Sequence, residues 1–273
     1  MNHGTRNPSR LNAIHRINDV IRRMNFKQVE TALYSTNMDK GVEICPASKA
    51  DWERYVTSEN QVLMSRAMLW RDGIVYIVEL PACLHESLSC NINAVRVATG
   101  TDKKHLKPRG STYAESIDRT EPDSSFGPTR NVGVTPPSNL RWGEFHTLKI
   151  EIGVSRGWTL LDEKADHWAT FPGVAYILCI RVTPNFEQRE FKLHAVSQCV
   201  DTMRAPISRD NPILDITEKT MVTMDSRRLL ALAQDALIPH GFADPSVSFA
   251  LLPQIRSAWY ESSRVEDGDV VPF

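Results

Sequence analysis

Apolar residues recur every three or four positions over residues 9–24, from Leu11 through Ile14 to Ile21. This spacing predicts a helix with one apolar stripe. The other face of this helix carries the basic side chains Arg10, His15, Arg16, Arg22 and Arg23. We interpret this face as solvated, with a nucleic-acid-binding arm as the alternative. A second, shorter helix is predicted over residues 49–57.

Two runs of strand-like composition follow, over residues 61–70 and 74–81. The tripeptide Arg-Asp-Gly lies between them, and Asp-Gly is a strong signal for a tight hairpin turn. The pattern then predicts a helix over residues 82–100. Residues 101–120 are charged and rich in turn formers, so we expect a surface connection there.

Residues 146–155 alternate between apolar and polar side chains, which predicts a strand with two different faces. One face carries apolar side chains and the other carries charges: Leu148, Ile150 and Ile152 against Lys149 and Glu151. A carboxylate in the middle of such a strand is costly if it is buried without a partner. Glu151 therefore stands out as a candidate functional residue.

The rest of the chain predicts a helix over 159–171, a buried strand over 174–183, a further strand over 189–200 and a helix over 225–238. The segment from Asp244 onward is weakly patterned. This order of elements predicts an α/β (α+β) fold, with a mixed central sheet flanked by helices.

Composition narrows the classes of protein. Hydrophobic residues make up 41% of the 273 residues, and the net charge is −1, so nucleic-acid binding would need a local basic patch. No apolar run has the length of a membrane helix, and the N-terminal residues lack the apolar centre of a signal peptide. We therefore expect an intracellular protein, cytoplasmic or nuclear. The cysteines are scattered without a CxxC pair, and we expect reduced thiols, mostly in the core: Cys45, Cys83, Cys90, Cys179 and Cys199.

Asp123 lies in the stretch EPDSSFGPTR at residues 121–130, which alone is typical of a turn. A Pro-rich loop joins this stretch to the strand that carries Glu151. If the two carboxylates converge, their repulsion would be relieved by a divalent cation, and hard oxygen ligands suit Mg²⁺. The two residues thus predict either a turn aspartate beside a strand glutamate, or a metal site for phosphodiester hydrolysis.

Three stretches, EPDSSFGP, KIEIGVS and LLDEKADHWATFPGVAYILCIRV, occur in this order and spacing. Together they resemble the PD-(D/E)XK restriction-endonuclease-like superfamily, nearest to uncharacterised fungal nuclease-like proteins. The resemblance covers about residues 60–200. It implies a restriction-endonuclease-like mixed central sheet and Mg²⁺- or Mn²⁺-dependent hydrolysis of DNA. We divide the chain into an N-terminal helical region (1–58), a nuclease-like α/β core (59–242) and a C-terminal tail (243–273).

By this resemblance Asp123 and Glu151 match the acidic metal ligands. The superfamily's lysine stands two positions after the second acid, where this chain has Gly153. Lys164 on the following helix is the preferred replacement, because relatives often place the lysine there. Lys149 is the rival, because residues two apart on a strand share a face.

Glu86 is a further candidate metal ligand, since the superfamily often supplies an acid from a helix before the sheet. Its neighbour His85 is expected to be a surface or core histidine. Trp142, Trp158 and Trp168 are interpreted as packing residues, with base stacking as the alternative. Active members of the superfamily often dimerise to cut both strands, so a homodimer is one expectation. The absent lysine at Gly153 supports the alternative of a catalytically degenerate module that binds a protein or nucleic acid.

Overall fold

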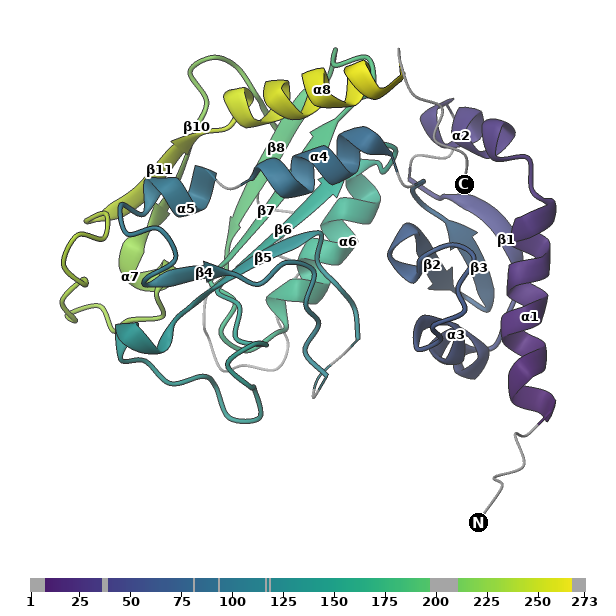
Figure 1. Ribbon diagram of the computed structural model, residues 1–273, viewed down its shortest axis with the longest axis horizontal. Helices are drawn as coiled ribbons and strands as arrows, with labels where there is room; N and C mark the ends of the chain where they lie inside the picture. Colours follow the sequence, from purple (N-terminus) through teal and green to yellow (C-terminus); the bar gives the residue numbers. More distant parts are fainter. Residues whose placement is uncertain are drawn as a thin grey trace. The chain divides into compact units, whose positions relative to one another are not determined.

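The computed structural model describes residues 8–35, 39–80, 82–92, 94–115, 117, 119–196 and 211–266 (Figure 1). The chain forms two compact units. The first comprises Met1–Pro81 together with Ser155–Gly157, and the second comprises Ala82–Val154 and Trp158–Phe273. This division differs from the predicted regions, because the hairpin that follows residue 58 belongs to the first unit.

The first unit is a three-stranded antiparallel sheet accompanied by helices. Its elements are α1 (Pro8–Arg23), α2 (Phe26–Ser35), β1 (Val42–Pro46), α3 (Lys49–Val56), the single-turn 3₁₀ helix η1 (Ser65–Ala67), β2 (Met68–Arg71) and β3 (Ile74–Ile77). The strand order is β1-β3-β2. The apolar stripe predicted over 9–24 is confirmed, since Ile17 and Ile21 are fully buried in the core of this unit.

The hairpin predicted at Asp-Gly is also confirmed. Asp72 and Gly73 both have positive φ, at 52° and 83°, and β2 and β3 pair directly across them. The start of the strand predicted over 61–70 is wrong. The side chain of Gln61 instead donates to the carbonyl of Tyr55 and accepts from the backbone N–H of Ser65, which ties this segment to the end of α3.

The second unit contains a six-stranded mixed sheet flanked by helices, in the order β4-β5-β6-β7-β8-β9. The strands are β4 (Leu106–Pro108), β5 (Ser124–Pro128), β6 (Leu148–Gly153), β7 (Tyr176–Val182), β8 (Arg189–Ala195) and β9 (Leu214–Asp215). β6 and β7 are parallel, and the other neighbouring strands are antiparallel. The predicted mixed sheet is therefore confirmed, although β4 lies within the expected surface connection.

Helix α6 (Trp158–Ala169) makes the crossover between the parallel strands β6 and β7 and packs on both. Helices α4 (Cys83–Asn91) and α8 (Leu252–Glu266) lie side by side (Figure 1). The single helix predicted over 82–100 is in fact two, α4 and the short α5 (Ala94–Ala98). A 3₁₀ turn, η2 (Arg130–Val132), follows β5.

The helix predicted over 225–238 is wrong. The chain there forms β10 (Met221–Asp225) and only one turn of helix, α7 (Ser226–Leu229). Asp225 caps this turn, and Ala231 adopts a left-handed φ of 56° directly after it. The weakly patterned C-terminal segment contains β11 (Ser246–Ala250), which pairs with β10, before α8.

Two smaller expectations are answered by the described residues. Cys45 and Cys179 are buried, whereas Cys83 and Cys90 are exposed, and these four cysteines form no disulfide among the described residues. Cys199 lies outside the described residues. None of the helices in the described part of the chain combines the length and apolar character that a membrane span requires.

Candidate active site

The pairing of two neighbouring strands puts Asp123 and Glu151 at facing positions. In the antiparallel pair β5–β6, Ser125 lies opposite Lys149 and Ser124 lies opposite Ile150. The same register, continued by one residue, puts Asp123 opposite Glu151. The two acids, 28 positions apart in the sequence, thus occupy facing positions where β5 begins and β6 approaches its end.

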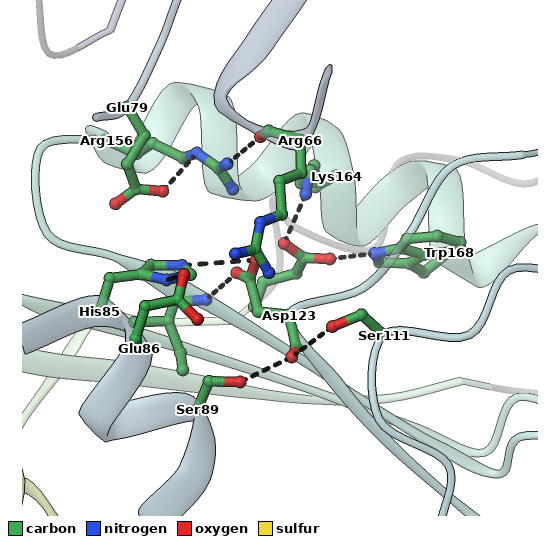
Figure 2. A network of polar contacts seen from close by, with 12 residues as sticks. Arg66, Glu79, His85, Glu86, Ser89, Ser111, Asp123, Arg156, Lys164 and Trp168 are labelled. Atoms are coloured by element: carbon green, nitrogen blue, oxygen red, sulfur yellow. Dashed lines mark hydrogen bonds and ion pairs between the residues drawn. The ribbon is translucent and has the colours of Figure 1, made fainter. Parts of the chain in front are cut away.

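Asp123 is buried, with 2% of its surface exposed, and its side chain is tied to β6. Its Oδ2 accepts a hydrogen bond of 2.7 Å from the backbone N–H of Ile152, the residue after Glu151. Its main-chain carbonyl accepts from the hydroxyls of Ser89 on α4 and Ser111, as Figure 2 shows. Asp123, directly before β5, is therefore hydrogen-bonded both to β6 and to α4.

Glu151 is fully buried, and both of its carboxylate oxygens have protein donors. Lys164 Nζ lies 2.7 Å from Oε2, and Trp168 Nε1 donates to Oε1 over 2.6 Å. The two donors are four residues apart on α6, so they project from one face of that helix toward β6. Figure 2 shows both side chains reaching from the helix. The geometry thus brings the predicted Glu151 and Lys164 together.

The two candidate lysines have different environments. The side chain of Lys164 is 22% exposed, so it contacts both Glu151 and solvent. Lys149 is 1% exposed, and its Nζ lies 4.0 Å from the centre of the Trp168 ring and 5.1 Å from that of Phe171. Within the described part of the chain this ammonium has no hydrogen-bond acceptor. Lys149 shares the face of Glu151, but it points into the interior.

Burial lowers the pKa of Lys149 from 10.5 to about 7. Attraction to Glu151 opposes this shift, and repulsion from Lys164 adds to it. Removal of an ammonium from water disfavours its charged form, and a single buried carboxylate only partly compensates. The ammonium on β6 is therefore far easier to deprotonate than an ordinary lysine.

Gly153 is the last residue of β6 and pairs with Arg181 of β7. It supplies no side chain at the position where the resemblance expects a lysine. The amine that contacts Glu151 comes instead from α6, the helix that follows this strand. Replacement from the next helix is sterically simple, because α6 crosses directly over β6.

Helix α4 brings His85 to the site. His85 Nε2 lies 3.4 Å from Asp123 Oδ1, and His85 Nδ1 lies 3.6 Å from Glu86 Oε1. His85 is buried, whereas the side chain of Glu86 is 46% exposed. His85 is thus a core histidine, which is one of the two expected environments. Its contact with Asp123 was not predicted. Glu86 reaches the group through His85 (Figure 2).

Trp168 packs in the core, as the sequence predicted, but its contact with Glu151 was not foreseen. This residue is fully buried, and its indole N–H donates a hydrogen bond to Glu151. Two signals in the sequence pointed this way: Trp168 follows Lys164 by one helical turn, and a buried indole N–H needs an acceptor. The other tryptophans have separate roles, since Trp158 donates to Glu190 and Trp142 stacks under Arg130.

The donor set fits a hard cation such as Mg²⁺. A carboxylate has about four lone-pair sites, so one bond to each oxygen of Glu151 leaves others for a ligand. Among the described residues there is no group of three or more His, Cys, Asp or Glu side chains arranged to hold a metal. Mg²⁺ is commonly held by only one or two carboxylates, with waters and phosphate oxygens completing its shell. Two acids at facing strand positions are consistent with that mode.

Comparisons with known proteins give a limited result. No family model matches the chain, and no curated protein matches it. Among solved structures the chain is similar to one described as "a putative nuclease belonging to DUF820" from Anabaena variabilis. The TM-score is 0.43 at 12% sequence identity, and the match covers 76% of this chain and 98% of the other.

Proposed function

We propose that the chain is a metal-dependent nuclease that hydrolyses phosphodiester bonds in DNA. One observation carries the proposal: Lys164 Nζ lies 2.7 Å from Glu151 Oε2, and Asp123 accepts a hydrogen bond from the backbone N–H of Ile152, the residue after Glu151. Glu151 and Lys164 are thus in direct contact, and Asp123 is tied to the backbone beside Glu151. Two carboxylates that could hold a metal ion, with an amine beside one of them, suit metal-assisted hydrolysis of a phosphodiester.

Each residue of the group has a distinct role in this proposal. Asp123 and Glu151 would hold Mg²⁺ or Mn²⁺, and the bound ion would neutralise phosphate charge and activate water. Lys164 is the lysine able to reach a substrate, because its side chain is partly exposed while its amine stays on Glu151. From this position it would donate to a phosphate oxygen as negative charge develops there. Trp168 would keep Glu151 in one orientation.

Cleavage of plasmid DNA in the presence of Mg²⁺ or Mn²⁺ tests the proposal. We expect cleavage by the wild type and a loss of at least about a hundredfold in Asp123→Asn, Glu151→Gln and Lys164→Met, since each removes a ligand or a charge from the group. Glu163→Gln is the matched control, because Glu163 is exposed on the same helix beside Lys164. Wild-type protein that is folded but cleaves with neither metal would refute the proposal.

A second candidate is a degenerate module that uses this fold to bind a protein or a nucleic acid. It is favoured by the observation that both oxygens of Glu151 already have protein donors. In this case Lys164 serves as a permanent counter-ion that substitutes for the metal. Calorimetric titration with Mn²⁺ separates the two candidates: a nuclease binds the ion and loses that binding in Glu151→Gln, whereas a degenerate module binds none.

A further inference from the structure

Lys149 is poorly explained as a packing residue. It is 1% exposed, and its ammonium faces the rings of Trp168 and Phe171 without a hydrogen-bond acceptor among the described residues. A buried charge in such a place usually destabilises a protein relative to an apolar side chain of the same size. A methionine would fill this space without that cost. The lysine therefore indicates a role other than stability.

A substrate-contacting role is excluded by the same burial. A phosphate group cannot approach an amine that is enclosed by a strand and two aromatic rings. The partly exposed Lys164 already supplies the amine that faces both Glu151 and solvent. What Lys149 does contact is the ring face of Trp168, the residue whose N–H bonds Glu151.

The contacts form a chain of three side chains. Lys149 Nζ lies 4.0 Å from the centre of the Trp168 ring, and Trp168 Nε1 lies 2.6 Å from Glu151 Oε1. A cation over an indole face is attracted to the ring and fixes its position. It also draws electron density from the ring, which makes the indole N–H a stronger donor in this low-dielectric interior. The ammonium of Lys149 thus affects Glu151, two residues further along β6, through the side chain of Trp168 on α6.

We propose that Lys149 and Trp168 are positioning residues that hold the carboxylate of Glu151 in the orientation needed for metal binding. The metal part of this inference rests on the proposed function, whereas the coupling between the three side chains does not. Partners that orient a metal-binding carboxylate typically change metal affinity or activity by about 10–100-fold when they are removed. Lys149→Met and Trp168→Phe each remove one link, and both keep an apolar body of similar size.

The coupling is measured first, in metal-free protein. The chain has 6 tryptophans, so the indole N–H signal of Trp168 is assigned by its loss from the NMR spectrum of Trp168→Phe. We expect Lys149→Met and Glu151→Gln each to shift this signal upfield, as the hydrogen bond weakens. An unchanged signal in Lys149→Met would overturn the inference.

Metal affinity and stability are measured next on the same variants. We expect Mn²⁺ to bind about tenfold or more weakly to Lys149→Met and Trp168→Phe, while Lys149→Met has an equal or higher midpoint of urea unfolding. Val247→Ala is the matched control. Val247 is buried on β11 and pairs with Met224 of β10, outside the core cluster that contains Trp168, so this variant should lower stability and leave Mn²⁺ affinity unchanged.

These outcomes keep the two proposals apart. If the wild type binds no Mn²⁺ but the indole signal shifts as expected, the proposed function fails and the orientation of Glu151 by Lys149 and Trp168 stands. If Mn²⁺ binds equally well to the wild type and to both variants, the positioning role fails and the metal site stands. A Lys149→Met protein that is less stable but unchanged in Mn²⁺ affinity would show that Lys149 only packs.

Discussion

Several buried titratable side chains gather around β6, and their energetics decide what each residue can do. Glu151 keeps two donors, whereas Lys149 has rings for neighbours and a pKa lowered to about 7. His146, just before the strand, is 1% exposed, and its Nε2 lies 2.9 Å from the carbonyl oxygen of Gly143. At the scale of single residues, function here depends on which charges the interior tolerates.

His146 provides a pH-dependent test of this interior. Burial is the main reason that the pKa of His146 falls from 6.5 to about 3. Repulsion from Lys149 and, less strongly, from Arg109 lowers this pKa further, whereas the hydrogen bond to Gly143 raises it. Between pH 6.5 and 3, His146 is therefore protonated in the unfolded chain but neutral in the folded chain. The free energy of unfolding consequently falls as the pH falls. The effect is at most about 5 kcal/mol.

His146→Gln removes this titration and can still donate to Gly143. We expect its free energy of unfolding, measured by urea at a series of pH values, to depend less steeply on pH in this window than that of the wild type. Equal slopes for the two proteins would mean that His146 titrates normally in the folded state.

The pair of strands β5 and β6 is the element that assembles the site. Their register puts Asp123 at the position facing Glu151, and the backbone approaches closely at Gly127. Gly127 in β5 is buried, and a Cβ atom there would collide with the main-chain carbonyl oxygen of Phe145. Only a residue without a side chain allows this approach.

Gly127→Ala should therefore disrupt this pair of strands. We expect a loss of stability on the order of 3 kcal/mol or more, because backbone rather than a flexible side chain must move. Gly143→Ala is the control, since a Cβ atom at Gly143 meets open space and should change stability by less than about 0.5 kcal/mol. Urea unfolding measures both, and similar values for the two variants would show that the strands can separate at little cost.

At the scale of the whole molecule, the chain leaves the second unit and returns to it between two site residues. β6 carries Glu151 and α6 carries Lys164, but Ser155–Gly157 between them belong to the first unit. Arg156 anchors this segment. Its Nε lies 2.9 Å from Glu79 Oε2, and its Nη2 donates a hydrogen bond to the main-chain carbonyl of Arg66. Both partners of this ion pair are buried, at 2% and 3% exposed.

Removal of one charge from this pair should be costly, because the other charge stays buried. We expect Glu79→Gln to lower the free energy of unfolding by about 3–5 kcal/mol. Asp19→Asn breaks a pair with Arg22 in which both side chains are about half exposed, and it should cost less than about 1 kcal/mol. Chemical denaturation of the full chain compares the two, and a small effect of Glu79→Gln would show that the segment is anchored by other contacts.

The sequence determined the elements whose pattern is local. The alternation around Glu151 identified β6 and the residues that share its faces, and the helical stripe identified α1. It also identified Asp123, Glu151 and Lys164 as a possible group. A period of two or of 3.6 residues reports which side chains share a face, because the backbone geometry alone sets it.

Only the tertiary structure decided how these faces meet. The strand register put Asp123 opposite Glu151, and burial separated the partly exposed Lys164 from the enclosed Lys149. The apolar residues near 229 pack beside the end of a strand, so their helical spacing misled the prediction over 225–238. The link from Lys149 through Trp168 to Glu151 arose when α6 packed on β6. Such contacts depend on desolvation and on close packing between distant segments, neither of which a local pattern encodes.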